Sequence, residues 1–161
     1  MKRSLAVTLS LVLLAPAALA ETSGRETLKG VVQVSVLVEG LTHEAEVAGL
    51  TARLLKTDIE LRLRHSRVPL SDSDDESLLC FRVAAEKLAD GRPWAYTVSV
   101  SDRQPVTLVR NKAWCVAETW HAGGVIALAS PAMFVETVRS HLGNVTDEFI
   151  GDYLAMNSNS P

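Results

Sequence analysis

The sequence has few of the residues on which small exported proteins often depend for stability or chemistry. Only two of its 161 residues are cysteines, and 5% are aromatic, so the position of each tryptophan is informative. Two cysteines make one disulfide at most, which excludes a disulfide-dependent scaffold. The sequence has no Gly-x-Ser-x-Gly elbow, Cys-x-x-Cys pair or phosphate-binding loop. We therefore expect a non-enzymatic protein that uses neither a cofactor nor a metal.

Long apolar runs are also missing, except at the N-terminus. Lys2 and Arg3 precede an apolar stretch from Leu5 to Leu14, and Ala18-Leu19-Ala20 then supplies the small residues that a signal peptidase recognises. This stretch is shorter than the roughly 20 residues of a membrane span. The pattern predicts a signal peptide cleaved after about Ala20, a periplasmic location and no membrane span in the mature chain. No cysteine follows the cleavage site, so we expect no lipid anchor.

An excess of basic residues is missing as well. The chain has 16 Lys and Arg against 19 Asp and Glu. Loss of the signal removes two of the basic residues and leaves 14 against 19, a net charge of −5. A nucleic-acid-binding domain normally shows a basic excess or a basic stripe. We therefore expect no nucleic-acid partner.

Strand-like and helix-like segments alternate through a single predicted domain at residues 31–156. The β-branched run Val31–Val38 predicts a buried strand. Thr51 is a suitable N-cap for a helix over Ala52–His65, whose leucines and Ile59 form an apolar stripe. Val68–Leu70 is a candidate short strand. We expect a flexible lead-in at residues 21–30 and a disordered tail at residues 157–161.

The second half of the chain predicts an antiparallel meander followed by a helix. Short, turn-rich connections separate three strand-like runs; these runs are Leu78–Glu86, Trp94–Leu108 and Lys112–Trp120. A long helix is predicted from Ser130 and Pro131, with apolar residues every three or four positions. We therefore predict an α+β fold, a two-layer sandwich in which a mostly antiparallel sheet carries the long C-terminal helix on one face.

The two predicted hairpins determine which side chains share a face. The first turn places Lys87 opposite Trp94, and the second places Leu108 opposite Ala113. One face of the sheet is then apolar and suited to packing under helices. The other, open face is polar and includes Cys80, Arg82, Arg103, Trp114, Glu118 and Trp120. Cys80 and Cys115 fall on opposite faces, which argues against a disulfide. A β-bulge near residues 103–105 would change these faces.

The open face supplies the candidate binding residues. Tryptophans beside arginines are typical of binding hot spots. The candidates are Trp114, Trp120, Arg82, Arg103 and His121, and the partner is an envelope protein or a lipid. Alternatively, this face is covered by the N-terminal segment, or by a second copy of the chain in a structural homodimer. The apolar run His121–Ser130 is predicted as a loop that tucks under the last helix, extends the sheet or awaits a partner.

A second class of function stays open. His43 lies beside Glu44 and Glu46, and imidazole with carboxylates suits zinc. The His-Glu-x-x-His spacing of a helical zinc site is absent. A small metal-dependent or hydrolytic periplasmic enzyme would require His121, His43 and nearby carboxylates to gather in one pocket.

Several short segments resemble a family of uncharacterised secreted bacterial proteins. These segments are Val38–Leu41, Gly49–Thr51, Asp58–Arg62, Arg103–Val106, Thr119-Trp120, Gly123-Gly124 and Phe149–Leu154. The order of predicted elements is also similar to that of small periplasmic α/β domains of the TolB N-terminal type and of outer-membrane assembly lipoproteins of the LptE and CsgG types. The resemblance implies a non-enzymatic envelope protein and supplies no active residue to transfer.

Overall fold

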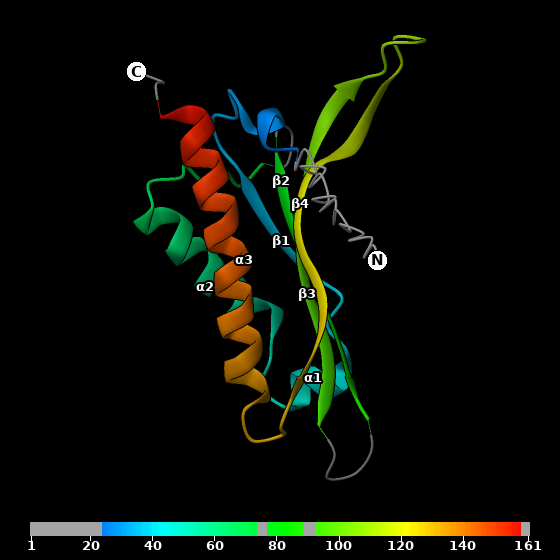
Figure 1. Ribbon diagram of the computed structural model, residues 1–161, viewed down its shortest axis with the longest axis vertical. Helices are drawn as coiled ribbons and strands as arrows, with labels where there is room; N and C mark the ends of the chain where they lie inside the picture. Colours follow the sequence, from blue (N-terminus) through cyan, green and yellow to red (C-terminus); the bar gives the residue numbers. More distant parts are fainter. Residues whose placement is uncertain (1–23, 74–76, 89–92, 159–161) are drawn as a thin grey trace, which may run out of the picture.

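The computed structural model describes residues 24–73, 77–88 and 93–158 (Figure 1). The predicted signal peptide at residues 1–20 lies outside the described residues, as does the end of the predicted tail. Within the described residues a four-stranded sheet has the order β1-β2-β3-β4. Its strands are β1 (Ser35–Glu39), β2 (Leu78–Lys87), β3 (Trp94–Thr107) and β4 (Trp114–Ala129).

The described helices are the 3-10 helix η1 (Arg25–Leu28), α1 (His43–Val47), α2 (Ala52–His65) and α3 (Phe134–Asn157). The two long helices, α2 and α3, form the second layer. β1 pairs in parallel with β2, and the other two strand pairs are antiparallel. Figure 1 shows α2 and α3 on one face of the sheet. The predicted α+β sandwich with a long C-terminal helix is therefore confirmed. None of the described helices combines the length and apolar character needed to cross a membrane.

Helix α2 forms where the sequence supplies both a cap and an apolar stripe. The Thr51 hydroxyl accepts a hydrogen bond from the Leu54 amide at 3.2 Å, which satisfies one of the free donors at the helix start. The stripe is buried; its residues are Leu55, Ile59 and Leu63. The predicted bounds of this helix are confirmed.

Helix α3 supplies much of the core above the sheet. Its buried apolar residues recur every three or four positions, as predicted. They are Phe134, Val138, Leu142, Val145, Phe149, Ile150 and Tyr153. Trp94 of β3 stacks on Phe134 with ring centroids 4.2 Å apart. Each large side chain of this kind stabilises the fold by roughly 1.5–3 kcal/mol when it is fully buried.

The N-terminal part of the domain differs in detail from the prediction. The strand predicted over residues 31–38 is limited to β1, because Val34 forms only an isolated bridge with Leu70. That bridge is all that is present of the predicted short strand at residues 68–70. The segment predicted as a flexible lead-in, residues 21–30, contains η1, whose Leu28 is completely buried. Besides this leucine, an ion pair between Arg25 and Asp152 and a hydrogen bond from Asn157 to the Leu28 carbonyl hold the segment on α3.

The end of the meander also differs from the prediction. The apolar run His121–Ser130 is not a loop, because β4 continues to Ala129, which pairs with Trp94. Of the three alternatives for this run, extension of the sheet is the one observed. Helix α3 begins at Phe134 rather than at Ser130, since a turn occupies the residues between them.

The register of the meander is as predicted as far as the first of two register shifts between β3 and β4, which lie at Asp102/Arg103 and at Thr97/Ser99. Lys87 pairs with Trp94, and the Leu108 amide donates to the Ala113 carbonyl at 2.9 Å. The second register holds as far as the pair Arg103 and Glu118, after which Asp102 pairs with Trp120. Thr119 is therefore an extra residue in β4, a β-bulge.

The bulge reverses the prediction for Trp120. A shift of one residue moves every following side chain of the strand to the other face of the sheet. Trp120 consequently points into the core and is 1% exposed. Its predicted place on the open face is wrong. That prediction assumed that no bulge lies near residues 103–105, and Thr119, which adds one residue to β4, lies next to the partners of this stretch.

Candidate functional site

The β3–β4 hairpin projects beyond the body of the molecule as an arm, residues 103–118. The pairing of β2 with β3 ends at the pair Leu78 and Arg103. Beyond Arg103, β4 is the strand that pairs with β3. Figure 1 shows the arm bending away from α3 at the upper end of the sheet. The Thr119 bulge lies at the start of this bend, and bulges increase the local twist of a strand pair.

Both faces of the arm are apolar. Direct pairs place Trp114 opposite Thr107, and Val116 opposite Pro105, on one face. The other face has the pair Val106 and Cys115 and, next to it, Leu108 opposite Ala113. Exposure is high for the large apolar side chains: 44% for Leu108, 85% for Val109, 69% for Trp114 and 58% for Val116. Contiguous exposed apolar side chains are a feature of interaction surfaces.

The charges on the tip of the arm are all positive. Arg110 and Lys112 flank Asn111 in the turn, and the sequence from Gln104 to Ala117 contains no Asp or Glu. Lys112 has φ 57, a left-handed conformation that the Asn111 side chain supports by accepting from the Ala113 amide at 3.2 Å. The arm is thus cationic, whereas the whole chain has a net charge of −3.

A buried polar cluster fixes the base of the arm. Asp102 is completely buried and accepts hydrogen bonds from the Ser77 hydroxyl at 2.6 Å and from the Gln104 amide at 2.5 Å. Burial raises the pKa of Asp102, and these two hydrogen bonds oppose the shift. The Thr119 hydroxyl donates to the Asp102 carbonyl at 3.3 Å. The bulge is therefore held by side chains from β3, β4 and the residue that precedes β2.

Trp120 anchors the same base to the helices. Its indole nitrogen donates to Asp152 of α3 at 3.0 Å, and its ring meets Phe149 edge-to-face with centroids 5.2 Å apart. Arg25 of η1 also pairs with Asp152 at 3.3 Å. Gly24 completes the junction, because a Cβ at this position would lie 2.0 Å from the Thr119 carbonyl oxygen. The base of the arm is therefore held in place by contacts with α3 and η1.

The open face of the sheet brings three of the predicted site residues together. Glu39 accepts from Arg82 at 2.7 Å and from Arg103 at 3.3 Å. Together with His121, which is largely exposed, the two arginines line a hollow of about 210 Å³ at the base of the arm. Of the five candidates, Trp114 lies apart on the arm and Trp120 lies in the core.

Electrostatics in this hollow are already balanced. The hydrogen bond from Arg82 is the main cause that lowers the pKa of Glu39. Cys80 lies below this pair, 2% exposed; burial first, and the hydrogen bond with Glu39 second, raise its pKa to about 11. A thiol with such a pKa is a poor nucleophile at neutral pH. Both cysteines are free thiols.

The histidines do not gather in one place. His121 pairs across the sheet with Ser101, level with Cys80. His43 starts α1, whose N-cap Thr42 donates to the Ala85 carbonyl at the far end of β2. His65 ends α2, and His141 of α3 makes an edge contact with Tyr96. Among the described residues no group of three or more His, Cys, Asp or Glu side chains is arranged to hold a metal ion. The arrangement required for the metal-enzyme alternative is therefore not present in this part of the chain.

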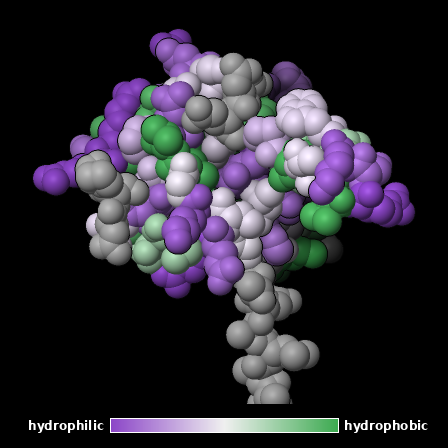
Figure 2. Space-filling view, turned by 90° about the horizontal axis from the view of Figure 1, so that it is seen from above, coloured by the Kyte–Doolittle hydropathy of each residue, from purple (hydrophilic) through white to green (hydrophobic). Residues whose placement is uncertain are grey.

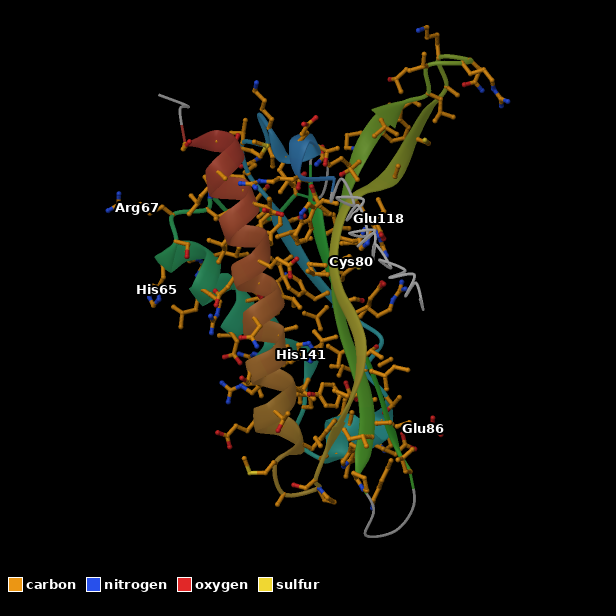
Figure 3. The ribbon with its side chains drawn as sticks, viewed as in Figure 1. His65, Arg67, Cys80, Glu86, Glu118 and His141 are labelled. Carbon is orange, nitrogen blue, oxygen red and sulfur yellow. The ribbon has the colours of Figure 1, made fainter. Side chains whose placement is uncertain are left out.

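A second hollow, which no sequence pattern predicted, lies at the opposite end of the sheet. This end hollow, of about 650 Å³, lies between the start of α1 and the ends of β2, β3 and β4. Ala84, Thr97 and Ile126 are aligned across its floor by strand pairing. Glu44 and Glu86 are on its rim, and Figure 3 shows Glu86 at the lower end of the molecule, far from Glu118 at the base of the arm.

Comparison with known proteins gives distant structural likenesses only. No family model matches the chain, and no curated protein matches it. A PelC dodecamer from Paraburkholderia phytofirmans is 14% identical, with a TM-score of 0.43, over 77% of this chain and 86% of that one. A minor lipoprotein from Acinetobacter baumannii is 12% identical, with a TM-score of 0.31, over 80% of this chain and 94% of that one. Neither likeness assigns a function to this chain.

Proposed function

We propose that this chain is a non-enzymatic accessory protein of the bacterial envelope that binds a partner through its β3–β4 arm. One observation carries the proposal: a two-stranded arm projects from the fold with large apolar side chains exposed on both of its faces. A hairpin of two strands gains little stability from exposed apolar residues in water. Side chains that do not stabilise the monomer are available for association.

The residues of the arm have the chemistry of a binding hot spot. Trp114 is flanked in space by the apolar Val116 and, along the turn, by Lys112 and Arg110. Tryptophan and arginine are enriched among the few residues that dominate interface energies, and truncation of such a residue often costs 2 kcal/mol or more of binding energy. Figure 2 shows hydrophobic and hydrophilic atoms next to each other on the side where the arm projects.

The contacts at the base of the arm also support a role in binding. The Asp102 cluster and the bond from Trp120 to Asp152 hold the start of the arm in one orientation. Such pre-organisation reduces the conformational entropy that is lost on association. Arg82, Arg103 and His121 lie next to this base, and we assign them to the rim of the same binding surface.

The place of action in this proposal comes from the sequence. The N-terminal pattern predicts a cleaved signal and a periplasmic protein, and the short segments described above resemble secreted envelope proteins. The partner of such a protein is another envelope protein or a lipid. This part of the proposal is tested by following the full chain to the periplasmic fraction and determining the N-terminus of the mature form.

Crosslinking in intact envelopes tests the arm directly. A photo-reactive amino acid replaces Trp114 in one variant and Leu61 in another; Leu61 is the control because it is 52% exposed on α2. We expect a discrete adduct from position 114 that is absent from position 61. The adduct should decrease at least severalfold when Val109 and Val116 are changed to Ser, since these side chains add apolar area to the same surface. Equal adducts from both probes, or none from position 114, would contradict the proposal.

A further inference from the structure

We infer that the arm docks on a second copy of this chain, and that its tip binds the end hollow beside α1 of the neighbouring copy. The inference rests on the proposed function, because it names the partner that the arm binds. It commits to a head-to-tail contact between two different surfaces of the same chain.

The arm has apolar side chains to be covered on two faces. Trp114 and Val116 lie on one face, and Leu108 lies on the other, next to Val106 and Cys115. A flat lipid surface covers only one face of a hairpin that lies on it, and a hairpin that enters tip-first would place Arg110 and Lys112 in the hydrocarbon, which is costly. A protein hollow covers a hairpin tip on several sides. The distribution of apolar residues therefore favours a protein partner over a membrane.

The tip of the arm and the end hollow are complementary in charge. The tip carries Arg110 and Lys112 and no acidic residue. Glu44 and Glu86 lie on the rim of the end hollow, and Lys87 is the one cation among the residues that line it. Glu46 adds a further exposed acidic side chain on α1. Opposite charges on the two surfaces favour the encounter and fix its orientation.

The end hollow also has exposed apolar side chains that match those of the arm. Beside the acidic rim, Ile126 is 74% exposed and Leu128 is 62% exposed. These residues belong to the part of β4 that lies past the second register shift, between Thr97 and Ser99. The hollow has a volume of about 650 Å³ and is a broad depression open to solvent. The hollow thus offers both an apolar floor and an acidic rim to a tip that is apolar and basic.

The two surfaces lie at opposite ends of the molecule. The arm continues β3 at its Thr107 end, whereas the end hollow surrounds the Trp94 end of the same strand, and Figure 1 shows the arm at the top and α1 at the bottom. A contact between different patches is heterologous, and when repeated it closes into a ring or continues as a filament. Such a contact does not make a two-fold dimer. It therefore differs from the homodimer considered in the sequence analysis, in which two copies cover each other's open face.

A charge-swap experiment tests the contact. The full chain is exported, purified from the periplasm and examined by sedimentation velocity over a series of concentrations. We expect the wild type to form species larger than a dimer. One variant combines Arg110→Glu and Lys112→Glu; the other combines Glu44→Lys and Glu86→Lys. Each alone should assemble only at concentrations about tenfold higher or more, because like charges then face each other. An equimolar mixture of the two should recover assembly, because a reversed tip meets a reversed hollow.

Controls separate this inference from the proposed function. Arg53→Glu with Lys56→Glu makes the same charge change on the exposed side of α2 and should leave assembly unchanged. A wild type that sediments as a monomer at about 100 µM, or a mixture that fails to recover assembly, would overturn the inference. Crosslinking from position 114 to a different protein, or arm-dependent flotation with phosphatidylglycerol vesicles, would in that case uphold the proposed function and identify the partner class. Loss of the position-114 adduct as well would overturn both.

Discussion

Asp102 is a carboxylate without solvent exposure at the base of the arm. Its two hydrogen-bond donors, Ser77 and Gln104, come from separate parts of the chain, so one side chain joins the start of β2 to the start of the arm. Burial of a charge is costly unless hydrogen bonds compensate it. Burial is the larger influence on the pKa of Asp102, which lies above its ordinary value of 3.8.

A raised pKa has a definite consequence for stability. The folded protein binds the Asp102 proton more tightly than the unfolded chain does, so this residue favours the fold most below pH 3.8 and loses that contribution as the pH rises through the folded-state pKa. Asp102→Asn removes the titration. We therefore expect the free energy of unfolding of the wild type, relative to that of the variant, to decrease as the pH rises from 3.8 through the acid range. Urea unfolding at a series of pH values measures this difference; a difference that is constant with pH would contradict the assignment.

At the scale of elements, the sequence allowed prediction of those helices and turns that are determined by interactions between residues close in sequence. The Thr51 cap and the buried stripe of α2 gave the bounds of that helix, and the turn residues gave the register of both hairpins. The bulge at Thr119 has no such signal. It depends on long-range contacts, namely the burial of Trp120 against α3 and the approach of η1. A one-residue irregularity changes faces completely, which is why Trp120 was misplaced while Trp114, before the bulge, was not.

The candidate site was predictable only in part for the same reason. Trp114, Arg82, Arg103 and His121 do lie on or near the surface around the arm. The projection of the arm could not be predicted, because it depends on where β2 ends relative to β3. The end hollow could not be predicted either, since it brings α1 beside three strand ends that are distant in sequence.

The two tryptophans of β4, one on the arm and one directly after the bulge, make a matched test of this element. Trp120→Phe removes the bond to Asp152 and leaves a small cavity beside Phe149; we expect it to lower the free energy of unfolding by about 1–3 kcal/mol. Trp114→Phe changes a side chain that is 69% exposed, and we expect a change of no more than about 0.5 kcal/mol. Urea denaturation of both variants gives the comparison. A loss for Trp114→Phe as large as that for Trp120→Phe would show that the arm packs on the body.

At the scale of the whole molecule, the fold divides into a body that contains the core and an arm that projects from it. The largest fully buried side chains include Trp120, Phe81, Phe134 and Phe149, and all of them lie in the body. The arm adds its exposed apolar residues and its two tip cations without contributing a buried apolar residue to the core. Stability and interaction are therefore assigned to different parts of one chain.

Removal of the arm tests this separation. Gln104 and Ala117 are directly paired, so a two-residue Asn-Gly turn can replace residues 105–116 and close the hairpin in a conformation that suits the twist of its strands. The body keeps the Asp102 cluster, Trp120 and the whole core, and we expect its free energy of unfolding to change by no more than about 1 kcal/mol. The shortened chain should remain folded but fail to assemble in sedimentation. A chain that does not fold would mean that the arm stabilises the monomer, and its exposed residues would then no longer indicate a partner.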